Sequence, residues 1–236
     1  MTKKEKESVI VFLNKLNLCC KGIETFFVSL VHSSYANEQI QVGRNDITSN
    51  ERLEFLGDAV VDLVVCDLLY RKYPNATEGE MSKVKAAVAS EKILSIMARE
   101  INLGDYLFLG KGEENTGGRN RDSILADAFE AFLGAIYMTY DLFKVKELFG
   151  KRFNHYISLV MEGKLLFDYK TALQEFTQRI SKELPEYRVV QKKNNSFVVE
   201  VLVNNKVMGK GSGRSKKEAE KAAAEAAYKA LMEDEK

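Results

Sequence analysis

The sequence is poor in the residue types that build disulfide frameworks, zinc centres and membrane spans. Its 236 residues include three cysteines, two histidines, two prolines and no tryptophan. Cys19, Cys20 and Cys66 form no Cys-x-x-Cys spacing, so reduced thiols inside a cell are the simplest interpretation. His32 and His155 are too few and too far apart for a zinc centre. No apolar run approaches the length of a membrane span and the N-terminus lacks a signal-peptide pattern, so we expect a cytoplasmic protein without membrane contact.

The positive charge of the chain is concentrated near its C-terminus. The net charge is +1. Residues 1–167 carry 21 Lys and Arg against 23 Asp and Glu, whereas residues 168–236 carry 14 against 11. Six of those basic residues lie within residues 204–221, beside two acids. A local basic patch of this kind suits binding to a nucleic-acid backbone.

The first part of the sequence has a helical pattern. Apolar residues recur with helical periodicity near residues 5–18, 24–33, 50–72, 79–101, 121–140 and 144–161. Asn50 is a candidate N-cap, Pro74 a stop signal, and Thr77 with Glu80 forms a capping-box pattern. We therefore predict an all-α domain over residues 1–161, followed by a linker at residues 162–167.

One of these helices carries a stripe of acids. Residues 50–58 read NERLEFLGD. Because successive helical residues turn by about 100°, Glu51, Glu54, Asp58 and Asp62 share a stripe roughly 80° wide. The opposite side is apolar. Four stacked acids with no basic residue among them repel one another, so a divalent cation is the obvious compensating partner.

A second acidic pair lies in ILADAFEAFLGAIY, residues 124–137. Asp127 and Glu130 are three residues apart and share a face of a largely apolar helix, where carboxylates are costly to bury unless paired or bound to metal. If the two helices pack together, these acids converge with Glu54 and Asp58 in an all-oxygen site for Mg²⁺ or Mn²⁺. Two alternatives are salt bridges to Arg52, Lys83, Lys85 or Arg121, and a di-iron bundle. The second lacks the Glu-x-x-His pairs that it needs.

The pattern changes at residue 168. A helix that stops before Pro185 is followed by three strands at residues 187–191, 196–203 and 206–211, and then by an alanine-rich helix that Ser215 caps. Asn194–Asn195 and Asn204–Asn205 are turn dipeptides between the strands. This α-β-β-β-α order over residues 168–236 resembles a double-stranded RNA-binding domain.

Three blocks carry a wider resemblance. NERLEFLGD, EGEMSKVKAAVAS and ILADAFEAFLGA, in this order, resemble the bacterial ribonuclease III family, and the match covers nearly the whole chain. The resemblance implies an all-α nuclease domain followed by a small α+β double-stranded RNA-binding domain. It implies a Mg²⁺-dependent endoribonuclease, without a small-molecule cofactor, that cleaves double-stranded RNA to leave 5′-phosphates and short 3′ overhangs. Processing of ribosomal RNA precursors and messenger RNA is the implied role.

The resemblance also assigns roles in cleavage. It implies Glu54, Asp127 and Glu130 as metal ligands, Asp58 and Glu130 as catalytic residues, and Glu78 as a further acid of the site. Phe55 flanks the acidic stripe, and in the family the matching aromatic packs into a second subunit, so the resemblance implies a homodimer. Glu51, Asp62 and Glu80 are expected to be surface acids.

The same resemblance assigns the RNA contacts. Lys216 and Lys217 are expected at a helix N-terminus, where the helix dipole also favours phosphate, and Lys221 extends this patch. Polar residues of the preceding helix are expected to bond 2′-hydroxyl groups, namely Thr171, Gln174, Glu175 and Gln178. The family often carries a Gly-Pro-x-His loop between the first two strands. Here that loop reads KKNNS, and Lys192 and Lys193 are candidate replacements.

Two other functions fit part of the sequence. One is a double-stranded RNA-binding regulator whose nuclease-like domain does not cleave, and the intact acids argue against it. The other is an acidic metal-dependent hydrolase of small phosphate compounds, which leaves residues 168–236 unexplained. The glycine-rich residues 108–121 follow no strand and lack the Lys-Ser tail of a P-loop, so a surface loop is the simpler interpretation.

Overall fold

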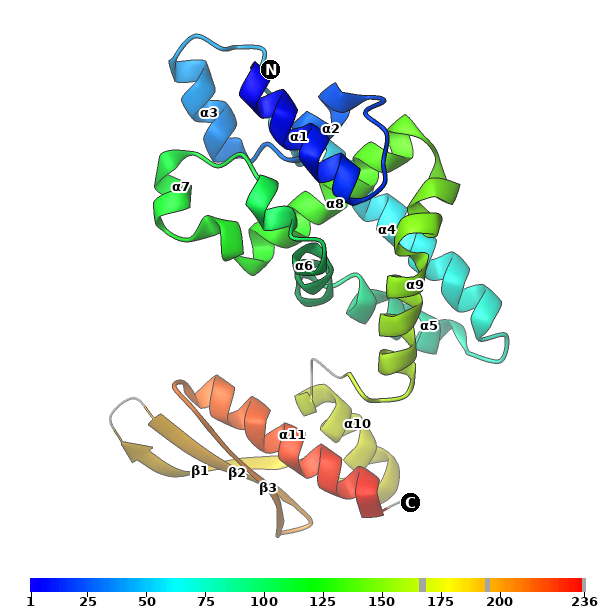
Figure 1. The fold of residues 1–236 in the computed structure, drawn as a ribbon. Coiled ribbons are helices and arrows are strands. Elements are labelled where there is room, and N and C mark those ends of the chain that lie inside the picture. The colour runs from blue at the N-terminus through cyan, green and yellow to red at the C-terminus, as the bar shows by residue number, and fades with distance from the viewer. Residues whose placement is uncertain (166–168, 194–195, 235–236) are drawn as a thin grey trace. The chain divides into compact units, whose positions relative to one another are not determined.

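The computed structural model describes residues 1–165, 169–193 and 196–234 (Figure 1). The chain forms two compact units, Met1–Leu165 and Leu166–Lys236. The predicted linker at residues 162–167 lies partly outside the described residues, as does the predicted Asn194–Asn195 turn. Among the helices of the described residues, none is long and apolar enough to cross a membrane.

The first unit is helical, as predicted. Its elements are α1 (Lys3–Lys15), α2 (Ile23–Ser29), α3 (Ser33–Gln41), α4 (Glu51–Lys72), α5 (Glu78–Val88), α6 (Glu91–Glu100), η1 (Leu103–Tyr106), α7 (Lys111–Asn115), η2 (Gly118–Asn120), α8 (Asp122–Thr139) and α9 (Leu142–Met161). Within residues 1–165 the only strand-like pairing is a single bridge between Val31 and Phe108. The all-α prediction for this unit is confirmed.

Local signals set several helix boundaries. Helix α4 ends at Lys72, two residues before Pro74, and α5 begins after a complete capping box of Thr77 and Glu80. The stretch predicted as helical over residues 79–101 holds two helices, because the chain turns at Ala89 and Ser90. Asn50 occupies the N-cap position of α4 but does not cap it, because its side-chain amide points to the carbonyl of Ser29.

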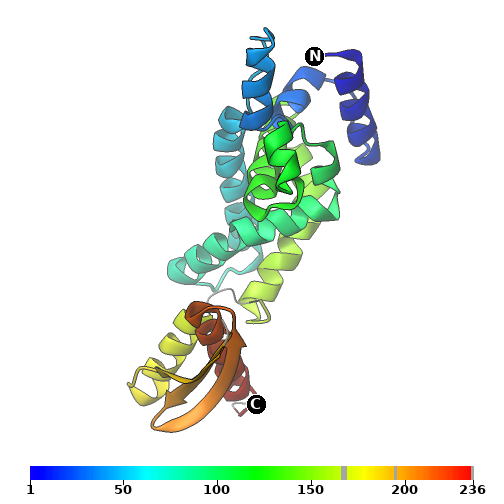
Figure 2. The same ribbon diagram turned by 90° about the vertical axis from the view of Figure 1, so that its left-hand side faces the viewer.

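Helix α8 is the centre of the first core. Eleven of its residues are buried, from Ile124 to Ile136. The ring of Phe132 packs against Phe12 of α1 and Phe26 of α2, with ring centroids 5.1 and 5.7 Å apart. Phe129 meets Phe149 of α9 edge to face at 5.3 Å. Helix α1 lies at the edge of the unit (Figure 2). One side of α1 is buried, and this side packs toward α8.

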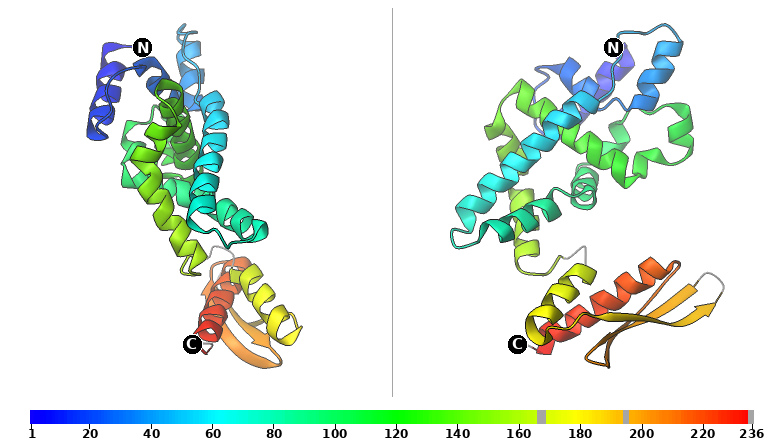
Figure 3. Two further views of the ribbon diagram at one scale, coloured as in Figure 1. Left: turned by 90° about the vertical axis from the view of Figure 1, so that its right-hand side faces the viewer. Right: turned by 180° about the vertical axis from the view of Figure 1, so that it is seen from behind.

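Two glycines allow α4 to lie directly against α8, which it crosses in the right-hand view of Figure 3. A Cβ atom on Gly57 would stand 1.9 Å from the carbonyl oxygen of Glu130. A Cβ atom on Gly134 would stand 2.5 Å from the carbonyl oxygen of Leu53. Real Cβ atoms do not approach backbone this closely, so only glycine permits the crossing. The crossing point lies beside the acids of both helices.

The second unit has the predicted α-β-β-β-α order. Its elements are α10 (Tyr169–Ser181), β1 (Glu186–Lys193), β2 (Ser196–Val203), β3 (Lys206–Gly213) and α11 (Lys216–Asp234). The sheet is antiparallel in the order β1-β2-β3. Asn204 and Asn205 have φ values of 51° and 61°, as a two-residue hairpin turn requires. The core joins both helices to the sheet through Leu173, Val199, Val201, Ala219, Ala223, Ala224 and Ala227.

Candidate functional site

Four carboxylates gather where α4 crosses α8. Glu54 and Asp58 flank Gly57 on α4, while Asp127 and Glu130 lie one turn apart on α8. Because Gly57 lies against the backbone of Glu130 itself, the close crossing brings the two acidic faces together. Glu54, Asp127 and Glu130 are half-buried and Asp58 is exposed. The structure thus brings together the four acids that the sequence singled out.

The electrostatics of these acids show that they act on one another. Burial, together with the negative charges of Asp58, Asp127 and Glu54, raises the pKa of Glu130 to about 8. Burial also raises the pKa of Glu54, with Asp127, Glu51 and Asp58 adding to the shift. The pKa of Asp127 is raised by burial and by Glu91. The site therefore holds more negative charge than it can stabilise alone.

Ion pairing does not relieve this repulsion. Among the ion pairs between described residues, none includes Glu54, Asp58, Asp127 or Glu130. Two of the candidate cations pair with other acids: Lys85 donates to Asp62 at 2.6 Å, and Arg121 lies 2.6 Å from Glu113. Asp62 therefore has a surface ion pair, whereas no ion pair between described residues includes a member of the cluster of four.

The four acids fit a divalent cation. All their donors are carboxylate oxygens, which suit Mg²⁺ or Mn²⁺ better than softer metals. As the described side chains stand, no three His, Cys, Asp or Glu residues surround one point, so an ion requires rotamer changes of these carboxylates. Such an ion would offset the mutual repulsion that raises the pKa values of Glu54 and Glu130.

Glu78 lies elsewhere within the chain. It begins α5, after α4 has run roughly 20 Å beyond Asp58. It accepts a hydrogen bond from the Ser82 hydroxyl at 2.8 Å and lines a pocket of about 430 Å³ with Tyr70 and Lys85. A single chain therefore does not bring Glu78 to the four acids. Two of the predicted surface acids have local roles: Glu51 accepts from Ser49, and Glu80 completes its capping box.

Two residues near Asp127 were not predicted as part of the site. Glu91 begins α6, and its charge raises the pKa of Asp127. His32 caps α3: its Nδ1 accepts from the backbone N–H of Ser34 at 3.2 Å. His32 lowers the pKa of Asp127. No pattern in the sequence links either residue to Asp127, because the contact depends on how separate helices pack.

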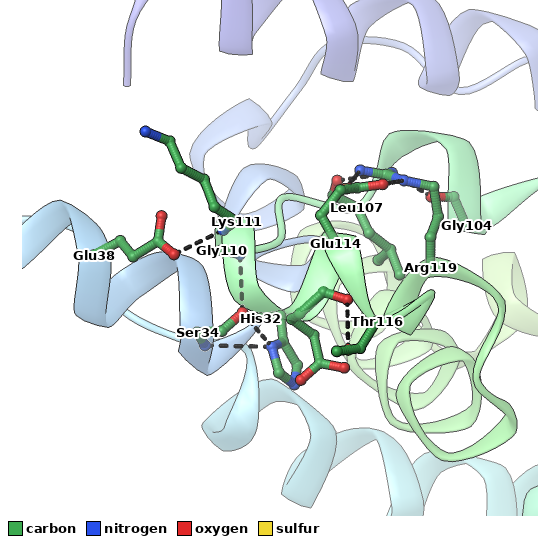
Figure 4. Close-up of polar contacts among 11 residues, drawn as sticks. His32, Ser34, Glu38, Gly104, Leu107, Gly110, Lys111, Glu114, Thr116 and Arg119 are labelled. Atoms are coloured by element: carbon green, nitrogen blue, oxygen red, sulfur yellow. Dashed lines mark hydrogen bonds and ion pairs between the residues drawn. The ribbon is translucent and has the colours of Figure 1, made fainter.

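Residues 108–121 form an ordered connection (Figure 4). The Ser34 hydroxyl accepts from the backbone N–H of Gly110 at 2.9 Å, and Glu38 accepts from that of Lys111 at 2.7 Å. Arg119 donates to the carbonyls of Gly104 and Leu107 at 2.6 and 3.0 Å. These bonds are structural, but the segment is partly helical rather than the predicted loop, because it contains α7 and η2.

Phe55 projects from the first turns of α4 into solvent. Its exposed fraction is 83%, the largest among the exposed hydrophobic residues of the described chain. It lies at the rim of a groove of about 960 Å³ whose other walls include Val28, Leu56 and Met138. The same groove is also lined by the charged residues Glu24, Glu51 and Arg52, so an exposed ring lies beside a groove of mixed polarity.

The predicted RNA contacts of the second unit are all exposed: Thr171, Gln174, Glu175, Gln178, Lys216, Lys217 and Lys221. The opposite face of α10 buries Leu173, Phe176 and Thr177. Lys216 and Lys217 are the first two residues of α11, as predicted, and the Ser215 hydroxyl accepts from the backbone N–H of Glu218 at 3.2 Å. These side chains are therefore accessible to a large ligand.

The stability of the metal-free protein should fall as the pH rises. Because the folded pKa of Glu130 is about 8 against 4.5 in the unfolded chain, its stabilising contribution is complete below pH 4.5 and lost as the pH passes 8. We expect the melting temperature in chelator to drop by about 2–8 °C between pH 5.5 and 8.5, and Mg²⁺ to restore it at pH 8.5. Glu5, whose pKa is lowered to about 2 despite its burial, changes stability only below this window.

The Glu130→Gln variant is the control for this measurement. Its melting temperature should depend less on pH over the same range, and Mg²⁺ should raise it less. An equal pH dependence in both proteins would show that Glu130 does not carry the effect.

The comparisons with known proteins cover the whole chain. A family model described as Ribonuclease-III-like matches residues 23–157, and one described as a double-stranded RNA binding motif matches residues 169–231. The chain is 50% identical to "Ribonuclease 3" of Pseudothermotoga lettingae over 238 residues, which cover 99% of this chain and all of that one. It is 43% identical to "Ribonuclease 3" of Borreliella burgdorferi, with 98% and 94% of the two chains covered.

Solved structures of ribonuclease III nuclease domains resemble the first unit of this chain. The nuclease domain of ribonuclease III from Campylobacter jejuni is 36% identical, with a TM-score of 0.54 over 61% of this chain and 94% of that domain. That structure is described as showing flexibility in a region involved in dimer formation. A second structure of the same domain is 35% identical with a TM-score of 0.53 and covers 66% of this chain.

Proposed function

The chain belongs to the ribonuclease III family, and from this premise we propose how its own residues cleave double-stranded RNA. The chain is a double-strand-specific endoribonuclease with a helical nuclease unit and a double-stranded RNA-binding unit. One observation supports the proposal above all. Where α4 crosses α8 at Gly57, four acids lie close together: Glu54, Asp58, Asp127 and Glu130. The family is dependent on a divalent metal, and we take Mg²⁺ as the ion, with Mn²⁺ as a substitute.

Each acid has a proposed task in hydrolysis. Glu54, Asp127 and Glu130 hold the divalent ion, which supplies charge stabilisation for the scissile phosphate when bound. Asp58, exposed beside Gly57, accepts a hydrogen bond from the attacking water and orients it toward phosphorus.

We propose that two copies of the chain form the working enzyme. The Phe55 ring of each protomer would enter the groove beside Leu56 and Met138 of the other, so that the contact repeats about a two-fold axis. Such a dimer presents one acidic cluster to each strand of a duplex. We propose that its products are staggered cuts with 5′-phosphates and short 3′ overhangs, as the family resemblance implies. Because one chain keeps Glu78 apart from its own cluster, a role for Glu78 in cleavage requires the second protomer.

Replacing Phe55 should weaken this dimer. In Phe55→Glu each copy loses its ring and brings a negative charge to a groove that already holds Glu24 and Glu51. We therefore expect the dissociation constant of the dimer to rise about 100-fold or more, a loss of about 3 kcal/mol. Sedimentation at several protein concentrations measures the change. The control is Phe143→Glu. Phe143 is also an exposed aromatic residue, but it lies on α9 and does not line the groove. A Phe55→Glu protein as dimeric as the wild type would exclude this interface.

The second unit binds the RNA duplex. We propose that Lys216, Lys217 and Lys221 contact phosphates, while Thr171, Gln174, Glu175 and Gln178 bond 2′-hydroxyl groups across the minor groove. The family's Gly-Pro-x-His loop is replaced by KKNNS, whose asparagines lie outside the described residues. Lys192 and Lys193 end β1, where their charges can reach phosphates.

Removing the two lysines at the start of α11 should weaken binding in a salt-dependent way. For Lys216→Ala combined with Lys217→Ala, we expect the slope of log affinity against log salt to fall by about 2, because two phosphate contacts disappear. Fluorescence anisotropy with duplex RNA in chelator measures this slope. An unchanged slope would place the phosphate contacts elsewhere.

A comparison of substrates tests the proposed function itself. With Mg²⁺, the protein should cut long duplex RNA and leave single-stranded RNA and free nucleotides intact. Binding of the duplex without cleavage would favour a regulator, and hydrolysis of nucleotides alone would favour a small-phosphate hydrolase. We propose a cytoplasmic role in processing ribosomal RNA precursors and messenger RNA. RNA sequencing tests this role, because cells that lack the protein should accumulate uncut precursors.

A further inference from the structure

Glu220 joins the two helices of the RNA-binding unit. Its carboxylate lies on the fifth residue of α11 and is only 15% exposed. One oxygen accepts from Lys170 of α10 at 2.7 Å, and the other lies 3.7 Å from Lys216, one turn earlier on α11. A half-buried acid between two lysines is thus placed at the edge of the basic patch, where phosphates are expected.

Lys170 extends this link to the sheet. Its ammonium group lies 4.5 Å from the ring centroid of Tyr187 on β1. Glu220, Lys170 and Tyr187 therefore connect α11, α10 and β1 through contacts between side chains. The charge pair and the cation–π contact share one lysine, so the loss of Glu220 would also release the constraint on Lys170.

Apolar contacts also join α10 to α11. Tyr228 packs against Tyr169 and Phe176, with ring centroids 6.2 and 5.9 Å apart, and Leu173 shares a core with alanines of α11. Tyr228 lies eight residues beyond Glu220, which is about 12 Å along the helix. Glu220 thus adds a polar contact with α10 near the N-terminal end of α11, beside Lys216.

Duplex RNA binding depends on the angle between α10 and α11. The proposed contacts come from both helices, Gln174 and Gln178 on α10 and Lys216 and Lys217 on α11. An A-form duplex presents its minor groove and phosphates at fixed separations, so the protein groups must be held at matching separations. Glu220 itself carries the wrong sign for RNA, and a view based on charge alone predicts that it opposes binding.

We propose that Glu220 is a positioning residue for duplex RNA, holding α10 and the start of α11 at the spacing that the minor groove and its phosphates require. This inference rests on the proposed RNA-binding role of the second unit. It predicts that removing a negative charge from a protein that binds a polyanion weakens the binding. The charge-only view predicts the opposite sign for the same substitution.

The test compares Glu220→Gln with Glu218→Gln in the full chain, by anisotropy with duplex RNA in chelator. Both variants remove one carboxylate from the start of α11, but Glu218 accepts from the backbone N–H of Arg214 just before the helix, a bond that glutamine can keep. We expect Glu220→Gln to bind about fivefold more weakly, a change of about 1 kcal/mol, and Glu218→Gln to bind as the wild type does or slightly more tightly. Binding by Glu220→Gln as tight as that of the wild type, or tighter, would overturn the proposal.

Lys170→Met provides an independent test from the other partner. We expect it to weaken binding about as much as Glu220→Gln, and the double variant to bind no worse than either single variant, because the same link is broken in each. Additive losses would mean that the two residues act separately and would reject the proposal. If Glu220→Gln fails to fold, as thermal unfolding would reveal, the comparison of Lys170→Met with the wild type decides. A wild-type chain that does not bind duplex RNA would instead reject the role of the whole unit.

Discussion

Glu130→Gln should abolish cleavage of duplex RNA while leaving its binding intact. The substitution keeps the size of the side chain but removes a carboxylate oxygen from the centre of the cluster. Because a metal-held transition state depends on several kcal/mol of charge stabilisation, we expect the cleavage rate to fall on the order of 10³-fold or more. Single-turnover cleavage with excess enzyme measures the chemical step, and anisotropy in chelator measures binding.

The control for this variant is Glu147→Gln. Glu147 is exposed on α9 and pairs with Lys144 in its own helix, so the same loss of charge should leave cleavage unchanged. Raised Mg²⁺ or Mn²⁺ should rescue Glu130→Gln only in part, since the amide remains a poor ligand. Full cleavage by Glu130→Gln at ordinary Mg²⁺ would remove Glu130 from the site, whatever happens to binding.

The sequence singled out the four acids that cluster at the crossing of α4 and α8, but it did not show how they meet. The stripe of Glu54 and Asp58 follows from the helical period alone, and so does the pairing of Asp127 with Glu130. What brings the pairs together is the absence of a side chain at Gly57 and Gly134. A glycine inside a helical pattern is uninformative until its neighbour is known. The influence of Glu91 and His32 on Asp127 was missed for the same reason, because it arises between helices distant in the sequence.

For the fold, too, local signals in the sequence were predicted more reliably than features that depend on tertiary packing. Signals that act within a few residues were predicted correctly, including the Thr77 capping box and the stop before Pro74. Helix α3 was missed because Ala36 is its only buried residue, so it shows almost no apolar period. The turn at Ser90 was missed because apolar residues continue in phase across it.

Gly57→Ala should therefore be among the most damaging single-methyl changes in this chain. The added Cβ would stand 1.9 Å from a backbone oxygen of α8 and 2.4 Å from the carbonyl carbon of the same residue. Backbone cannot rotate away as a side chain can, so α4 must move off α8. We expect a loss of about 3 kcal/mol and a melting temperature about 6–12 °C lower. Cleavage should also fail at temperatures where the variant is folded, because the acids of the two helices separate.

The matched control is Gly150→Ala in α9. Gly150 is also a buried glycine inside a long helix, but an added Cβ meets only the Cβ of Lys146, at an ordinary 3.8 Å. Alanine is the better helix former, so this change should leave stability unchanged or raise it by about 0.5–1 kcal/mol. Both variants add one methyl group to a helix, and only one adds it between two backbones. The opposite result would be a Gly57→Ala protein that melts at the same temperature as Gly150→Ala and still cuts RNA. In that case α4 and α8 would not need their close contact, and the convergence of the four acids would need another cause.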